Sequence, residues 1–418
     1  MALAFAYLDI RDLDLPVPLP AVLFTGAILA RNLFSAMVGA LLTMITVSFS
    51  TIMVVLTLYS GQFTPRITRD FIQGRVPMRV LGVFMGSFVF SIVSLYSLDK
   101  AADEHSLLSP FVGVILAMAC LAFFGYFIQH VARSVQINHI IDGISQDITR
   151  AVQRDIDEIE ESDTLKRYFD ERPEDLSAEP LVEIPIPEAG FVNGIDYPGL
   201  VQVASEHDVM LNLETRVGEY LEEDDIAATV YAYSGADPSV DNLSAEIAAK
   251  LSCGTDRDST EDVEFGIIIL VEVALRAISP GINDPNTAIY CISKLGPILR
   301  MIGRELESLY YHDEDSVMRL HVQNLEFSDL LYGTYQQLRV YGKGDVSVLG
   351  ALLDSISVIA DGEQPVATND LWELAHYLVS GLDIDSIPDM DRRYLNRKIR
   401  DLARTLSADP SELLLTAE

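Results

Sequence analysis

Hydroxyl side chains recur at regular spacing within one uncharged stretch of this chain. Four of them, Thr43, Thr46, Ser50 and Thr57, stand three, four and seven residues apart. Residues at such intervals fall on one face of an α-helix, because the helix turns once in about 3.6 residues. In a membrane, a row of hydroxyls either lets helices pack closely, which is the commoner use, or faces water and lines an ion path. The spacing by itself leaves both interpretations open.

The stretch that carries these hydroxyls is long enough to cross a bilayer. Residues 35–58 contain no ionisable side chain, and a helix of that length measures about 36 Å. Residues 80–98 and 107–128 are two further uncharged segments of spanning length. We therefore predict a transmembrane α-helical bundle within residues 1–134.

The chain before the first of these spans has a different character. We interpret the apolar start of the sequence as the last turns of a fourth span whose beginning is missing. Residues 21–34 are apolar but interrupted by Arg31 and Asn32. We expect them to form a separate helix that lies at the membrane interface or folds back, ahead of the first full span.

The segments that join the predicted spans differ in charge. Four arginines follow the first span, whereas residues 9–14 and 99–105 are mainly acidic. Cytoplasmic loops carry an excess of Lys and Arg, so the arginine loop and everything after residue 130 are expected to be cytoplasmic. We place two sets of polar residues at the ends of the first span: Gln62, Arg66 and Arg69 at an inner mouth, and Asp9, Asp12 and Asp14 at an outer acidic mouth. The plainer interpretation of the arginines, that they only orient the spans, is compatible with this one.

The net charge of the chain belongs to its C-terminal part. The formal charge is -33 overall; residues 1–134 carry eight Lys and Arg against seven Asp and Glu, which is +1, so residues 135–418 carry -34. A nucleic-acid partner is excluded, because a phosphate-binding surface needs Lys and Arg. The acidity either raises the cation concentration near a conduction path or serves solubility, and the second explanation is the commoner one.

The sequence offers little for enzyme chemistry. It has no HExxH, GxSxG or GxxxxGK[ST] motif, and Cys120, Cys253 and Cys291 form no CxxC pair. These are the patterns that would indicate a zinc protease, a serine hydrolase, a phosphate loop or a structural metal site. We therefore predict no catalytic residue, no cofactor and no metal ion, and we expect that the protein is not an enzyme.

One turn in the soluble part is dense in polar residues. Ser279, Asn283 and Asp284 lie within the sequence SPGINDP. Such a turn can bind a cation or a neighbouring subunit. The structural interpretation is stronger: Pro280 and Gly281 end one helix, Asp284 is a natural N-cap, and a proline follows it at the first position of the next helix.

The soluble part divides into three segments by pattern. Residues 135–180 predict an amphipathic stalk helix and an acidic linker, with Ile and Val every three or four residues up to Ile159. This apolar stripe winds around the helix and does not keep a strict seven-residue repeat. It therefore favours packing on other elements over a coiled coil between subunits. Residues 181–235 predict a small β unit, because short runs rich in Val, Ile and Tyr alternate with Gly and Pro. Residues 236–418 predict a helical domain, with helices near 261–278, 286–309, 315–341, 346–360, 368–380 and 391–406.

Two motifs carry a family resemblance. They are Gln62-Phe63-Thr64-Pro65-Arg66, at the end of the hydroxyl-rich span, and the turn from Ser279 to Pro285. With them, nearly the whole chain resembles a bacterial family of predicted membrane proteins known as domain of unknown function 2254. The resemblance implies four spans followed by a cytoplasmic α/β domain in the inner membrane, and no established activity. This chain departs from that pattern by lacking most of the first span.

These observations lead to one functional expectation and one alternative. We expect a homo-oligomeric channel for monovalent cations in the lipid bilayer, lined by the hydroxyls of residues 35–61. No ionisable residue interrupts that span, which disfavours proton-coupled transport and leaves passive conduction. The alternative is a membrane-anchored sensor or scaffold whose cytoplasmic domain binds a ligand or partner.

Overall fold

The structure is a computed structural model in which the chain divides into two compact units, Met1–Ile140 and Ile141–Glu418. The structure describes residues 25–62, 75–98, 109–134, 136–161, 176–177, 179–186, 188–233, 242–257, 262–303, 309–322, 325–361 and 368–415.

Three long apolar helices form the first unit. They are α2 (Ala27–Gln62), α4 (Arg75–Leu98) and α5 (Ser109–Ser134). Each holds a segment long and apolar enough to cross a membrane, over Ala27–Thr57, Val76–Leu98 and Ser109–Arg133. The prediction of three spans is confirmed. The predicted fourth span falls on residues outside the described part of the chain and stays a prediction.

The first span begins earlier than the sequence pattern indicated. We predicted a separate interfacial helix over 21–34, but α2 runs without a break from Ala27 through Arg31 and Asn32. No proline or glycine lies between residues 27 and 38 to interrupt the helix. An arginine near a helix end can also extend its charge toward the headgroups, so it does not require a break.

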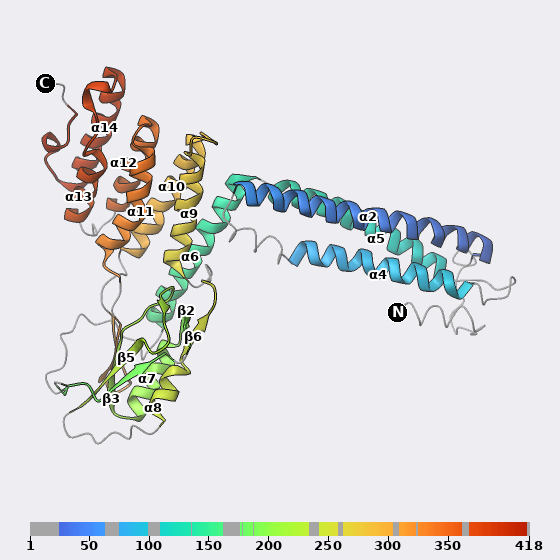
Figure 1. The fold of residues 1–418 in the computed structure, drawn as a ribbon, viewed down its shortest axis with the longest axis horizontal. Coiled ribbons are helices and arrows are strands. Elements are labelled where there is room, and N and C mark those ends of the chain that lie inside the picture. The colour runs from blue at the N-terminus through green and yellow to red at the C-terminus, as the bar shows by residue number, and fades with distance from the viewer. Residues whose placement is uncertain are drawn as a thin grey trace. The chain divides into compact units, whose positions relative to one another are not determined.

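Aromatic and small residues join the three helices, which lie side by side in Figure 1. The rings of Phe34 on α2 and Phe90 on α4 meet edge to face, with centroids 6.0 Å apart. Gly113 of α5 lies against Phe34, where an added Cβ would be 2.9 Å from the ring. Glycine at this point therefore lets two helices approach closely, as small residues do in membrane bundles.

Helix α6 (Ile137–Glu161) follows α5 in the chain and enters the second unit at Ile141. Its apolar face is buried, with Ile141 and Ile148 fully inaccessible. Ile148 lies against Gly266 of α9 (Val263–Ala277). The expectation that this helix packs on other elements of its own chain is thereby confirmed.

The second unit contains two sheets. The larger has the strand order β1-β5-β3-β8-β7 and is antiparallel except between β3 and β8, which are parallel. The smaller has the order β4-β2-β6. The strands are β1 (Val182–Pro185), β2 (Gly190–Ile195), β3 (Val209–Leu213), β4 (Tyr220–Leu221), β5 (Ile226–Ala232), β6 (Leu251–Gly254), β7 (Leu309–His312) and β8 (Met318–Val322).

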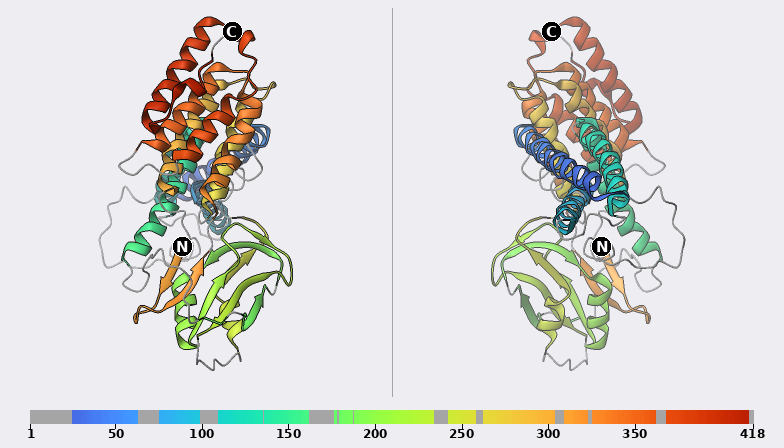
Figure 2. Two further views of the ribbon diagram at one scale, coloured as in Figure 1. Left: turned by 90° about the vertical axis from the view of Figure 1, so that its left-hand side faces the viewer. Right: turned by 90° about the vertical axis from the view of Figure 1, so that its right-hand side faces the viewer.

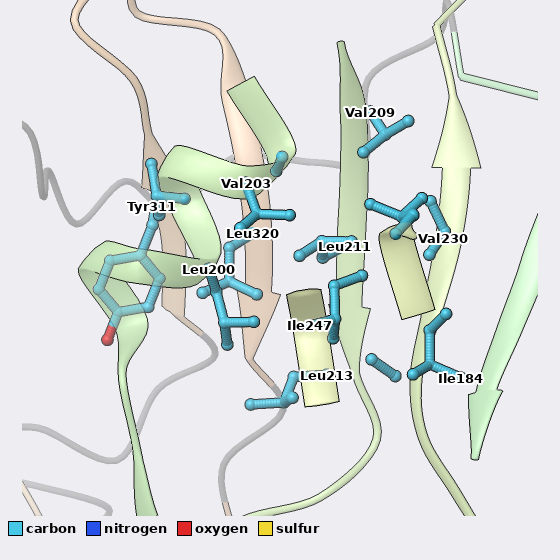
Figure 3. Packing of buried hydrophobic residues seen from close by; sticks show 14 of the residues in the cluster. Ile184, Leu200, Val203, Val209, Leu211, Leu213, Val230, Ile247, Tyr311 and Leu320 are labelled. Atoms are coloured by element: carbon cyan, nitrogen blue, oxygen red, sulfur yellow. The ribbon is translucent and has the colours of Figure 1, made fainter. Parts of the chain in front are cut away.

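Helices α7 (Tyr197–Glu206) and α8 (Leu243–Ala248) pack on the larger sheet. Figure 3 shows the core between them, where Leu200 of α7 meets Leu211 of β3 and Leu320 of β8. These three side chains are fully buried. The core thus joins residues that are more than 100 positions apart in the chain.

The prediction that the chain is helical from residue 236 onward is wrong where β7 and β8 form a hairpin. The predicted helix at 315–341 is wrong over its first part, since residues 318–322 form β8 and the helix α11 begins only at Phe327. Strand β6 also lies beyond residue 235. The local pattern was misleading because the strand β3 that pairs with β8 is distant in sequence.

Six helices form a bundle at the other end of the second unit (Figure 2). They are α9, α10 (Pro285–Ile302), α11 (Phe327–Gly342), α12 (Val346–Ala360), α13 (Thr368–Val379) and α14 (Asp389–Leu406). Apart from the start of α11, their predicted positions are confirmed to within a few residues, except that α10 ends at Ile302 rather than near 309. Two 3₁₀ turns, Ile384–Ser386 and Pro410–Glu412, flank α14.

Candidate functional site

The four predicted pore-lining residues lie on one outward face of α2. Thr43, Thr46, Ser50 and Thr57 are all exposed in the single chain. At 100° per residue they fall within an arc of about 60°. The buried residues of the same helix, including Phe34, Leu41, Ser48 and Val55, are centred on the opposite side, about 170° away. The hydroxyl face is therefore turned away from α4 and α5.

The threonine hydroxyls of this face are bonded to their own helix. Thr43 Oγ1 donates to the carbonyl oxygen of Gly39, Thr46 Oγ1 to that of Leu42 and Thr57 Oγ1 to that of Met53, each at 2.9 Å. A hydroxyl that gives its only proton to the backbone offers just its oxygen lone pairs to the outside. The face accordingly presents hydrogen-bond acceptors, which suit a cation and not an anion.

The predicted mouths of the path fall largely on residues that the structure does not describe. Gln62 is the last residue of α2, and its side chain lies outside the described part. Arg66, Arg69, Asp9, Asp12 and Asp14 also lie outside it. Their roles stay predictions.

The polar turn before α10 is built from capping interactions. Asp284 accepts hydrogen bonds from the backbone N–H of Thr287 at 3.3 Å and from its hydroxyl at 2.7 Å. Asn283 adopts the left-handed conformation with φ of 52°, and Ser279 donates to the carbonyl oxygen of Arg276 at 2.6 Å. The structural interpretation of all three residues accounts for these bonds, and binding of a ligand or a subunit by this turn stays a prediction.

Comparison with known families matches this chain over residues 1–357 to a family described as "Predicted membrane protein (DUF2254)". The chain belongs to this family. The match includes both motifs that carried the resemblance and ends before α13 and α14.

The relatives of this DUF2254 protein include uncharacterized proteins of Mycobacterium tuberculosis and Mycobacterium bovis. Each is 26% identical over 340 residues, which cover 79% of this chain and 64% of the relative. The chain thus spans less than two thirds of the length of these relatives. No solved structure matches it.

The interior of the DUF2254 membrane unit holds a row of polar residues that the sequence reasoning missed. Ser87, Ser91 and Ser94 of α4 are buried, and the thiol of Cys120 on α5 donates to Ser87 Oγ at 3.2 Å. The spacing of four and three residues was the signal, since it is the same pattern that marked the face of α2. Ser91 Oγ donates to the carbonyl oxygen of Ser87 within α4 at 2.8 Å, while the bond from Cys120 to Ser87 joins α5 to α4. In this chain one polar stripe is therefore buried and the other faces out.

A second cluster joins α6 to α10 inside the second unit. Asp142 Oδ1 accepts a hydrogen bond from the Tyr290 hydroxyl at 2.6 Å and lies 2.7 Å from Lys294 Nζ. The hydrogen bond to Asp142 raises the pKa of Lys294, so its ammonium stays charged. This cluster fixes the first turn of the second unit to α10, the helix that follows the polar turn.

Among the described residues, no group of three or more His, Cys, Asp or Glu is arranged to hold a metal ion. The outward hydroxyl face of α2 remains the candidate site.

Proposed function

We propose that the protein is a homo-oligomeric channel for monovalent cations in the bacterial inner membrane, with α2 lining the path and the soluble unit in the cytoplasm. The observation that carries the proposal is the outward hydroxyl face of α2, which its own bundle does not cover. Oxygen acceptors on such a face replace part of the hydration shell of a cation.

The residues beside this face suit a ring of helices. Met53 and Val54 flank the hydroxyls on opposite sides and are 59% and 58% exposed. Each lies about 50° from the centre of the hydroxyl face. In a ring of α2 helices, the apolar flanks pack against the neighbouring copies while the hydroxyls face the axis.

The charge distribution supports cations over anions. The acidic segments beside the spans and the acidity of residues 135–418 attract positive ions. Residues 35–58 contain no charged side chain. A cation that passes along this segment therefore meets no group that would bind it too tightly.

The second candidate is a membrane-anchored sensor or scaffold. The hydrogen bonds of the threonines to their own helix favour it, because hydroxyls bonded in this way do not need water. In that case the face of α2 is dry and packs against lipid or another helix.

The two candidates are distinguished by thiol labelling during planar-bilayer recording in KCl. The background is Cys253→Ser, because Cys253 is exposed while Cys120 and Cys291 are buried. Thr46→Cys and Ser50→Cys place thiols on the hydroxyl face. A cationic methanethiosulfonate should block the current through both variants, and a KCl gradient should give a reversal potential near that of K⁺.

Two controls match these variants. Thr51→Cys removes the same kind of hydroxyl bond from the same helix but lies about 110° away from the centre of the hydroxyl face. Met118→Cys places a thiol on α5, where the side chain is 68% exposed. Neither control should be blocked. The channel is refuted by the absence of conductance in the Cys253→Ser protein, or by equal block of all four variants.

A further inference from the structure

The last long helix of this acidic protein is basic. Helix α14 carries six Arg and Lys against three Asp, a net charge of +3, within residues 135–418 whose net charge is -34. It lies beyond the region that the family comparison matches, which ends at residue 357. Its charge is therefore a feature of this chain that the family assignment does not explain.

Four of its arginines form a straight stripe. Arg393, Arg397, Arg400 and Arg404 stand four, three and four residues apart, and all four are exposed. At 100° per residue they fall within about 60° of one another and extend about 16 Å along the helix axis. We call these four residues the arginine stripe. Figure 2 shows α14 in red on the outside of the helical bundle.

Most of the arginine stripe is not engaged in ion pairs within the described part of the chain. Arg404 lies 3.3 Å from Asp401, but Arg393, Arg397 and Arg400 form no ion pair with any carboxylate in the part of the chain that the structure describes. The off-stripe cations behave differently, since Lys398 is 2.6 Å from Asp354 and Arg392 pairs with Asp389. The outward cations are thus available for a partner, while the inward ones serve the fold.

The opposite face of α14 is committed to the bundle. Leu395, Ile399 and Leu402 are buried, and α14 packs chiefly on α12. The helix therefore has no apolar face left to insert among lipid tails, unlike an interfacial amphipathic helix. Its partner must be a surface of negative charge that guanidinium groups contact from outside.

We propose that the arginine stripe docks on anionic phospholipid headgroups of the bilayer that the spans of the same chain cross. Guanidinium groups bind phosphate oxygens in pairs, which an ammonium cannot do. The membrane spans hold the domain at a high effective concentration of headgroups. A nucleic acid or an acidic protein is the poorer partner, because the spans of this chain hold the stripe close to lipid headgroups and not to either of them.

Docking orients the soluble unit, because α14 is a basic surface on a body of opposite sign. An anionic leaflet attracts the stripe and repels the acidic remainder. The proposal rests on the membrane association of the chain and not on conduction.

The test uses the full-length protein in lipid nanodiscs, one set of phosphatidylcholine alone and one with added phosphatidylglycerol. A donor dye on Thr405→Cys, in the Cys253→Ser background, reports energy transfer to acceptor-labelled headgroups. Thr405 is exposed near the C-terminal end of α14 and directly follows Arg404 in the sequence. Transfer should be high only with phosphatidylglycerol and should fall at high salt, as expected for contacts between exposed charges.

Two double variants on the same helix provide the matched comparison. Arg393→Gln with Arg400→Gln removes two charges of the stripe and should lower the docking equilibrium about 30-fold. Arg392→Gln with Lys398→Gln removes two charges away from the stripe and should leave docking within about twofold. The fluorescence of Trp372, the single Trp of the chain, checks that both variants remain folded.

Three results would overturn the proposal: equal transfer in neutral and anionic nanodiscs, equal losses in the two double variants, or transfer in neutral nanodiscs that appears only when a second copy of the protein is added. The last result would assign the stripe to a protein partner. None of them bears on the current through α2, so the two proposals fail separately.

Discussion

Replacement of Gly266 by alanine tests how closely α6 is held against α9. A Cβ built on Gly266 overlaps Cγ1 of Ile148 and lies 3.0 Å from Cδ1. Ile148 is fully buried and its β-branched side chain is stiff, so it cannot move aside. Overpacking of this kind costs about 1–3 kcal/mol, whereas alanine gains about 1 kcal/mol over glycine inside a helix. We expect Gly266→Ala to lower the free energy of unfolding by up to about 2 kcal/mol.

The same substitution should have the opposite sign once Ile148 is truncated. Ile148→Ala alone should cost about 2–5 kcal/mol, because it leaves a cavity in the packed interface. It also removes Cγ1 and Cδ1, and the remaining Cβ of residue 148 lies 3.8 Å from the Cβ added at position 266, an ordinary contact. In that background Gly266→Ala should stabilise the protein by up to about 1 kcal/mol. The coupling between the two sites is then about 1–3 kcal/mol.

The assay is urea unfolding of the full-length protein, followed by the fluorescence of Trp372 in α13. Gly333→Ala is the control, because Gly333 lies inside α11 and nothing stands within 4 Å of a Cβ added there. This control should stabilise the protein by about 0.5–1 kcal/mol. The reasoning is refuted if Gly266→Ala stabilises the wild-type protein, or if its effect is the same with and without Ile148.

Three further predictions concern the second unit. Burial favours a raised pKa for Asp313, but its hydrogen bonds with Arg319 outweigh this and hold the pKa below its usual range; the stability it contributes is present above about pH 4 and is lost as the pH falls through the lower folded pKa. Asp313→Asn should lower the free energy of unfolding by about 3 kcal/mol. It should also weaken the dependence of that free energy on pH below about pH 4, measured by urea unfolding at a series of pH values. Tyr335→Phe should cost about 1–3 kcal/mol in the same assay, because it leaves the buried Ser355 hydroxyl without the partner it has at 2.6 Å. Burial raises the pKa of Cys291 to about 12, so mass spectrometry should find its thiol unmodified by maleimide at pH 8 until urea unfolds the protein.

Several elements of this protein follow from short stretches of sequence. The three spans are set by uncharged segments that only a bilayer or a protein interior accommodates. The polar turn before α10 followed from its own residues, because a cap such as Asp284 bonds within its own turn. The division between a membrane part near neutrality and a strongly acidic remainder is likewise a property of composition.

Tertiary structure decided the features that depend on distant partners. Residues 315–322 resemble a helix by pattern, yet β8 forms because β3 offers it a parallel edge more than 100 residues away. Helical spacing marked hydroxyl stripes without saying which way each one faces. Only the packing of α4 and α5 turns Ser48 inward and Thr46 outward on the same helix, because burial is determined by the neighbours that cover a face and not by the residues that make it up.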